Sequence, residues 1–73
     1  MQNKEIRLQI ANKIKLARKE AKLTQYELAD TLFTDQTNIS YIESGKSGIN
    51  IDRLVDFAKA LNKPIIYFLS DIS

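Results

Sequence analysis

Apolar residues at the start of the chain recur at the three- and four-residue spacing of an amphipathic helix. This spacing predicts a helix over residues 4–22. The side that would face the core consists of Ile6, Ile10, Ile14, Ala17 and Ala21. Leu8 and Leu16 lie off this stripe. They either pack against the C-terminal segment or a second chain, or stay exposed as single leucines commonly do.

Two shorter helices with a tight turn between them are predicted for residues 24–44. Thr24 and Glu27 have the spacing of a capping box, in which a hydroxyl and a carboxylate each accept a hydrogen bond from an unpaired backbone N–H. Asp35 is placed to cap the second helix, with its charge near the positive end of the helix dipole. Gly45 is expected to end that helix, because glycine accepts the left-handed conformation.

The spacer between these two helices, residues 32–34, is so short that the helices must cross steeply, as in a helix-turn-helix. On the first helix the apolar side consists of Leu28, Ala29 and Leu32. The second helix has only two core anchors, Ile39 and Ile42. Its other positions carry amide, hydroxyl and phenol groups: Gln36, Thr37, Asn38, Ser40 and Tyr41. Such a helix is poorly suited to filling a core and well suited to lying on a surface that offers hydrogen bonds.

The last third of the chain predicts two further helices. Asn50 is placed to cap a helix over residues 51–61, and Asn62 is expected to end it in the left-handed conformation. The expected core side of this helix is Ile51, Leu54, Val55, Phe57, Ala58 and Leu61. Pro64 fits the first turn of a short last helix ending near Ser70, because its missing N–H costs nothing there. The whole pattern therefore predicts an all-α fold of five helices.

The composition narrows the possible functions. A chain of 73 residues allows one domain, expected over residues 1–73. The absence of cysteine and histidine excludes disulfides, thiol chemistry and the usual zinc sites. No glycine-rich phosphate loop, nucleophile elbow or paired-carboxylate pocket is visible, so we expect neither an enzyme nor a cofactor. The chain has no run of about 18 apolar residues and no signal-like N-terminus, which fits a cytoplasmic protein.

The net charge of +2 is unevenly placed along the chain. Residues 1–22 hold seven basic and two acidic side chains, a net charge of +5, whereas residues 23–73 hold four basic and seven acidic ones, a net charge of −3. This asymmetry indicates either a polyanionic partner near one side of the molecule or simply a solvated helix face.

Four short motifs in a fixed register suggest a family. They are Leu23-Thr24-Gln25, Glu27-Leu28-Ala29, Asp35-Gln36-Thr37-Asn38-Ile39-Ser40 and Ile42-Glu43-Ser44-Gly45-Lys46. Over roughly residues 8–69, the chain resembles the Cro/repressor-type helix-turn-helix family, also called the XRE family. The resemblance implies a sequence-specific transcriptional regulator that binds double-stranded DNA. The expected form is a homodimeric repressor on a palindromic operator.

Other functions remain open at this point. Within the same class, the alternatives are an antitoxin that represses its own operon or a restriction–modification controller that regulates its own operon. In a different class, the chain would be a small helical adaptor that binds another protein. A steep loss of affinity with salt would separate DNA binding from the adaptor.

The resemblance makes the second helix of the motif a recognition helix in the major groove of DNA. Candidate base-reading residues are Gln36, Thr37, Asn38 and Tyr41. A glutamine amide can donate and accept together, which matches N6 and N7 of adenine, and the methyl group of Thr37 suits thymine. Candidate contacts to the DNA backbone are Gln25, Thr34, Ser44, Lys46, Ser47 and Arg18. The alternative for the first-turn residues is ordinary solvated polarity.

Two further roles follow from the resemblance alone. The positions of Arg18 and Glu43 imply a salt bridge between the first helix and the end of the recognition helix. In the last helix, Ile66 and Tyr67 match positions near the dimer axis, while the inward positions are Ile65, Phe68 and Leu69. The alternative for the first pair is an exposed apolar patch near a fraying end.

The chain departs from the family pattern at the turn. Phe33 occupies a position where members usually have glycine, because the turn often needs a positive φ. A bulky residue in that conformation costs about 1–2 kcal/mol. Either the turn is reshaped, or packing of the phenyl ring offsets the strain. Lys63 and Pro64 also replace a more usual apolar residue and a small capping residue, so the entry to the last helix departs from the pattern as well.

Overall fold

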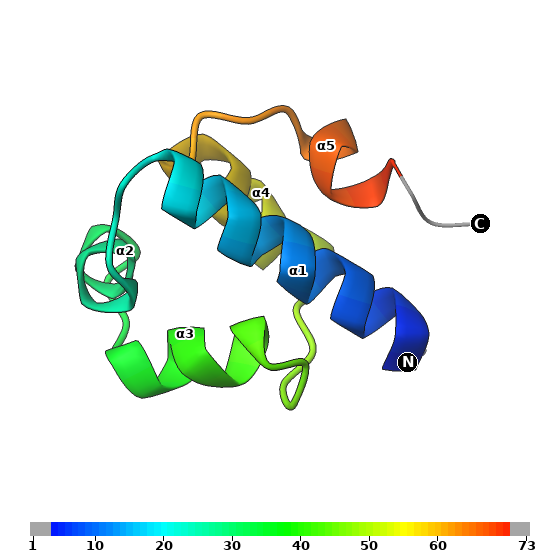
Figure 1. The fold of residues 1–73 in the computed structure, drawn as a ribbon, viewed down its shortest axis with the longest axis horizontal. Coiled ribbons are helices and arrows are strands. Elements are labelled where there is room, and N and C mark those ends of the chain that lie inside the picture. The colour runs from blue at the N-terminus through cyan, green and yellow to red at the C-terminus, as the bar shows by residue number, and fades with distance from the viewer. Residues whose placement is uncertain (1–3, 71–73) are drawn as a thin grey trace.

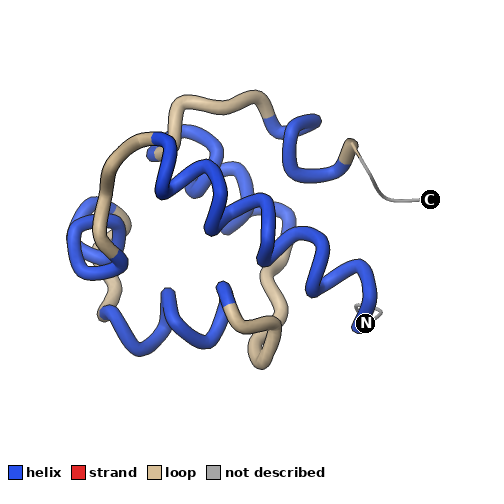
Figure 2. Tube along the Cα trace, viewed as in Figure 1, coloured by secondary structure: helices blue, strands red, loops and turns tan. Residues whose placement is uncertain are grey.

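A computed structural model describes residues 4–70 of the chain, which contain five helices and no strand (Figures 1 and 2). The helices are α1 (Lys4–Glu20), α2 (Gln25–Thr31), α3 (Gln36–Glu43), α4 (Ile51–Ala60) and α5 (Ile65–Leu69). The prediction of an all-α, five-helix fold is confirmed. In Figure 1, the long helix α1 crosses the middle of the molecule, with α3 on one side and α5 on the other.

Each helix contributes one large anchor to a common core. The largest side chains that are less than 2% exposed are Ile14, Leu28, Ile39, Phe57 and Phe68, one from each of α1 to α5 in order. Burying each of these side chains contributes about 1.5–3 kcal/mol. No helix is held by its own hydrogen bonds alone, so the relative placement of α2 and α3 depends on this shared core.

The helix starts follow from capping residues that the sequence displays. The hydroxyl of Thr24 accepts from the amide of Glu27 at 3.0 Å, and the Glu27 carboxylate accepts from the amide of Thr24 at 2.9 Å. Asp35 accepts from the amide at position 38, and Asn50 from the amide at position 53, both at 2.8 Å. All three predicted caps are confirmed.

Four helix ends share one motif. A residue with positive φ follows α1, α2, α3 and α4: Lys22 (61°), Phe33 (57°), Gly45 (79°) and Asn62 (56°). The next amide then donates to the carbonyl five residues back, as from Leu23 to Arg18 at 3.1 Å and from Thr34 to Ala29 at 2.9 Å. This is the Schellman arrangement, which satisfies carbonyls that a helix leaves unpaired. The predicted left-handed stops at Gly45 and Asn62 are confirmed, and Lys22 and Phe33 add two more.

Some expectations about core positions and one about a helix start are wrong. Ile51 and Val55 are exposed, because they lie one turn apart on a flank of α4 outside the arc that Leu54, Phe57, Ala58 and Leu61 bury. Ala21 is also exposed, because α1 ends at Glu20 and turns away before that residue can face the core. Pro64 is the N-cap of α5 rather than part of its first turn, since its ψ of 152° is extended.

Leu8 has a packing role that its position off the apolar stripe did not reveal. A Cβ atom at Gly45 would overlap Leu8 Cδ2 and lie 3.2 Å from Leu8 Cγ. Glycine is therefore favoured here by its positive φ, and a side chain at this position would also displace the side chain of Leu8. The side chain of Leu8 thus contacts the loop after α3 but is still 40% exposed, and Leu16 is 53% exposed.

Among residues 4–70, no helix combines the length and apolar character that crossing a membrane requires.

Candidate nucleic-acid interface

The helices α2 and α3 present a polar surface on the outside of the molecule. Figure 1 shows α2 nearly end-on and α3 along its length, which is the steep crossing expected from the short spacer between them. Ile39 and Ile42 anchor α3 to the core. Gln36, Thr37 and Tyr41 are exposed on its other side, and Asn38 and Ser40 are partly exposed. The polar side of α3 is therefore free to meet a partner.

A buried ion pair joins the end of α3 to α1. Arg18 Nε lies 2.7 Å from Glu43 Oε2, and Arg18 Nη2 donates to Glu43 Oε1 at 3.1 Å. The remaining terminal nitrogen, Nη1, donates to the carbonyl of Leu23 at 2.7 Å. The two side chains are only 10% and 3% exposed. Two parallel hydrogen bonds make this a bidentate arginine–carboxylate pair, which is stronger than a single bond between neutral groups. It matches the salt bridge expected from the sequence.

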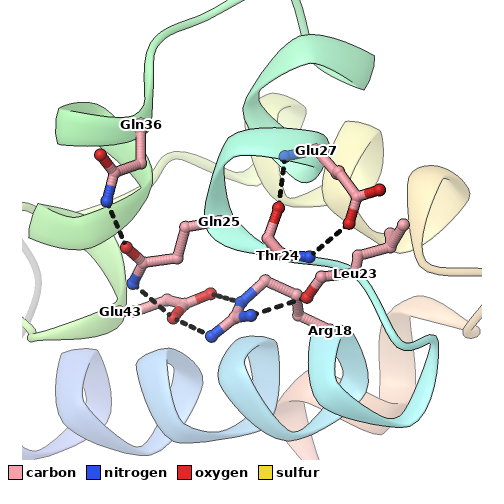
Figure 3. Close-up of polar contacts among 7 residues, drawn as sticks. All are labelled: Arg18, Leu23, Thr24, Gln25, Glu27, Gln36 and Glu43. Carbon is pink, nitrogen blue, oxygen red and sulfur yellow. Dashed lines mark hydrogen bonds and ion pairs between the residues drawn. The ribbon is translucent and has the colours of Figure 1, made fainter.

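The ion pair continues as a chain of amides to the start of α3. Gln25 Nε2 donates to Glu43 Oε1 at 3.1 Å, and Gln36 Nε2 donates to Gln25 Oε1 at 2.9 Å (Figure 3). The series Arg18–Glu43–Gln25–Gln36, here called the polar relay, thus connects α1, α3 and α2. A glutamine amide nitrogen carries two N–H groups. Gln36 therefore keeps one N–H and its carbonyl oxygen for an external partner.

A second polar group lies at the other end of α3. The hydroxyl of Ser44 donates to the carbonyl of Tyr41 at 2.9 Å and accepts from the amide of Lys46 at 3.4 Å. The ammonium group of Lys46 lies 5.8 Å from the centre of the Tyr41 ring. Ser47 donates to the carbonyl of Gly48 at 3.3 Å. The structure therefore brings Tyr41, Ser44, Lys46 and Ser47 together near the C-terminal end of α3, whereas Gln36 is the first residue of this helix.

Tyr26 is a candidate residue that the sequence analysis missed. Its exposed side chain lines a cleft of about 360 Å³ together with Thr34, Asp35 and Gln36. An aromatic residue directly after Gln25 was the available signal, because the first turn of α2 adjoins the start of α3. Tyr26 and Gln36 therefore line the same cleft.

The comparisons with known proteins agree with this arrangement. The model of the helix-turn-helix family HTH_3 matches residues 14–68, which is most of the chain. The chain belongs to the HTH_3 family. This confirms the family expected from the sequence, since HTH_3 is the XRE-type helix-turn-helix. No curated protein matches the chain by sequence.

Solved structures of related regulators have the same fold. An HTH_3 family transcriptional regulator from Vibrio cholerae is 26% identical with a TM-score of 0.84, over 94% of this chain and 39% of that one. The restriction-modification controller C.AhdI from Aeromonas hydrophila is 18% identical with a TM-score of 0.78, over 84% and 92%. The clp gene regulator ClgR from C. glutamicum is 18% identical with a TM-score of 0.82, over 93% and 94%. The chain thus spans well under half of the Vibrio cholerae protein.

The two expected dimer residues of this HTH_3 chain differ in accessibility. Ile66 is 63% exposed, whereas Tyr67 is half-buried. Lys13 and Lys63 lie over the Tyr67 ring with their ammonium groups 5.0 and 4.7 Å from its centre. Glu20 accepts a hydrogen bond from Lys63, and this bond raises the pKa of Lys63 above its ordinary value. Ile66 is therefore the more available of the two for contact with a second copy.

Phe33 follows neither of the two alternatives that the sequence left open. The turn keeps its positive φ of 57°, so it is not reshaped. The phenyl ring is 97% exposed, so packing within the chain does not offset the strain. The Schellman bonds at the end of α2 explain why the conformation persists, since Thr34 donates to Ala29 only when Phe33 is left-handed.

Proposed function

We propose that this HTH_3 chain is a sequence-specific, double-stranded DNA-binding transcriptional repressor. The observation that supports this function best is the polar relay, which holds a base-reading type of side chain at the exposed start of α3. A helix anchored by two buried isoleucines and otherwise polar has the form that enters a major groove in helix-turn-helix proteins.

In this proposal, α3 reads bases along its exposed side. Gln36 donates its second N–H to N7 of an adenine and accepts from N6, which is the usual pairing of glutamine with that base. Thr37 lies beside it with a methyl group that suits thymine, and Asn38 reaches a base or a phosphate. Tyr41, one turn further, contacts a base edge or the backbone of the other strand.

The proposed backbone contacts lie at both ends of α3. Lys46, Ser44 and Ser47 meet phosphates beyond the C-terminal end, and Gln25 and Thr34 meet them near the N-terminal end. Arg18 engages all three guanidinium nitrogens within the protein, so it contributes to DNA contact only through the second N–H of Nη1 or Nη2. Its main proposed role is to orient Glu43 and, through it, Gln25.

The proposed assembly is a two-fold dimer on a palindromic operator. Two recognition helices of such a dimer enter successive major grooves about 34 Å apart. The exposed Ile66 supports an interface on α5. We place the protein in the cytoplasm, associated with DNA, and assign it no catalytic step.

Two alternatives keep a supporting observation. The likeness to the controller C.AhdI favours a regulator that controls its own operon, as a restriction–modification controller or an antitoxin does. The exposed Phe33 favours the helical adaptor, since an aromatic side chain in water suits a protein partner.

The proposal is tested by selecting bound duplexes from a random DNA pool and measuring affinity for the selected sequence at several salt concentrations. We expect a palindromic sequence and a linear fall of log affinity with log salt. Lys46→Ala should weaken binding to all sequences alike and reduce the salt slope by about one. If no sequence is enriched, or if affinity does not depend on salt, the proposed function is wrong and the adaptor is favoured.

A further inference from the structure

A side chain from α4 reaches the turn between α2 and α3. Arg53 Nη2 donates to the carbonyl oxygen of Leu32 at 3.1 Å, although the two residues are 21 positions apart. Leu32 is the C-cap of α2. The last carbonyls of a helix have no partner within it, so they need one from elsewhere. Arg53 supplies that partner for the residue directly before the turn.

The guanidinium group of Arg53 is itself held in place from two sides. Its Nη1 lies 3.5 Å from Asp56 Oδ2, one turn further along α4. Its central carbon lies 5.7 Å from the centre of the Phe57 ring, a distance at which a cation is attracted to an aromatic face. Phe57 is fully buried. Contacts with Asp56 and with the buried ring of Phe57 therefore fix the guanidinium group in the position from which it bonds Leu32.

The Leu32 carbonyl belongs to the turn that sets the direction of α3 relative to α2. Phe33 follows it in the left-handed conformation, and the amides of Phe33 and Thr34 close the end of α2 by donating to Asp30 at 3.2 Å and Ala29 at 2.9 Å. The cap of α3, Asp35, comes directly afterwards. A rotation of the Leu32 peptide would therefore be passed on to the start of α3.

We infer that Arg53 is a positioning residue for DNA reading. It contacts no base in this inference; by fixing the Leu32 carbonyl it sets the direction in which α3 presents Gln36. The inference rests on the proposed function for its DNA consequence. The structural part, that Arg53 holds the turn, can be measured without DNA.

Lys59 offers a matched control on the same helix. It lines the same hollow as Leu32, Phe33, Arg53 and Asp56, of about 410 Å³, and it is exposed. Arg53→Met and Lys59→Met each remove one positive charge from α4 and keep an unbranched apolar side chain. Any effect of charge alone on DNA affinity is therefore common to the two variants, and the loss of the Leu32 bond is not.

The first measurement is amide hydrogen exchange of the free protein. In Arg53→Met, exchange at the amides of Phe33 and Thr34 should accelerate by about tenfold or more, the usual consequence of losing a hydrogen bond from a charged donor. The amide of Ile14 inside α1 should keep its rate, and Lys59→Met should leave all three unchanged. A purely structural role of Arg53 would instead accelerate all three amides together.

The second measurement is the ratio of affinities for the selected DNA and a mismatched duplex. This ratio should fall by about tenfold in Arg53→Met, within the 1–3 kcal/mol that one good base contact supplies. It should stay at the parental value in Lys59→Met. If Arg53→Met does not fold, Arg53→Lys replaces it, because lysine keeps the charge but lacks the two separate terminal nitrogens with which arginine contacts Leu32 and Asp56.

The outcomes separate the inference from the proposed function. A parent protein without sequence preference contradicts the proposed function, and the exchange rates still decide whether Arg53 holds the turn. Unchanged exchange at Phe33 and Thr34 overturns the inference. Faster exchange there with an unchanged affinity ratio also overturns it, because the turn would then not control reading.

Discussion

Gln25 holds Gln36 by a hydrogen bond of 2.9 Å between the two side-chain amides. The same Gln25 amide donates to Glu43, which is paired with Arg18 in the interior. A side chain on the outer surface is thereby tied to a buried charge through one intermediate residue. Substitutions in the polar relay are therefore expected to separate into those that change DNA reading and those that change stability.

Gln36→Ala tests the reading end of the polar relay. The substitution should cost about 1–3 kcal/mol on the selected DNA and relax the preference at one base pair, as the loss of a bidentate contact does. Stability should change little, because Gln36 is exposed. Binding curves on matched and mismatched duplexes measure the effect. Identical curves for parent and variant would show that Gln36 reads no base.

Glu43→Ala tests the buried end. Removing one partner leaves the Arg18 guanidinium buried without its counter-charge, which should lower the free energy of unfolding by about 3–5 kcal/mol. A double-mutant cycle with Arg18→Ala, followed by urea unfolding, should give a coupling energy above about 0.5 kcal/mol. Additive effects of the two substitutions would mean that the ion pair contributes nothing of its own.

Phe33→Gly should stabilise the domain. Glycine removes the left-handed strain of about 1–2 kcal/mol. The greater freedom of glycine in the unfolded chain opposes this by about 0.4–1 kcal/mol, so the net gain in the free energy of unfolding should lie between zero and about 1.6 kcal/mol. Phe33→Ala is the control: it keeps the strain and should match the parent. If the alanine variant is clearly less stable, the exposed ring contributes to the free protein after all.

Gly45→Ala should destabilise the domain through two separable terms. The positive φ of 79° costs about 1–2 kcal/mol for a residue with a Cβ atom. The new methyl group must also displace the side chain of Leu8. In a Leu8→Ala background only the first term should remain, so the penalty measured by urea unfolding should shrink. An equal penalty in both backgrounds would show that Leu8 moves aside freely.

Ile66→Asp tests the proposed dimer. The apolar patch on α5 is small, so the interface should bury well under about 1,200 Å² and give weak dimers in solution. The variant should lower the dimer population in sedimentation and reduce affinity for the palindrome far more than for a single half-site. Leu16→Asp, at another exposed apolar position, should do neither. The reverse result would move the interface to α1.

Features that depend on neighbouring residues in the chain were accessible from the sequence. Thr24, Asp35 and Asn50 cap helices through amides three positions ahead, so spacing alone predicts them. The left-handed stops at Gly45 and Asn62 follow from the chemistry of single residues. Lys22 takes the same conformation without glycine or asparagine chemistry, because the Schellman bonds at the end of α1 impose it.

Features that depend on how the helices cross could not be predicted from the sequence. Ile51 and Val55 are as apolar as the buried residues of α4, and only the positions of the other helices decide that their flank stays uncovered. The bond between Gln25 and Gln36 spans 11 positions, and that between Arg53 and Leu32 spans 21. Both require the angle between two helices, which no local pattern contains.

The polar relay also affects which partner, the protein or the DNA, changes its conformation when the two bind. An unrestrained glutamine loses about 0.5–1.5 kcal/mol of rotational freedom when it is immobilised at an interface. The bond to Gln25 already restricts Gln36 in the free protein, so less of this freedom remains to be lost on binding. A side chain held in this way adapts poorly to a displaced base pair. The duplex would have to do the adapting, so the ease with which an operator bends and twists becomes part of what the protein selects.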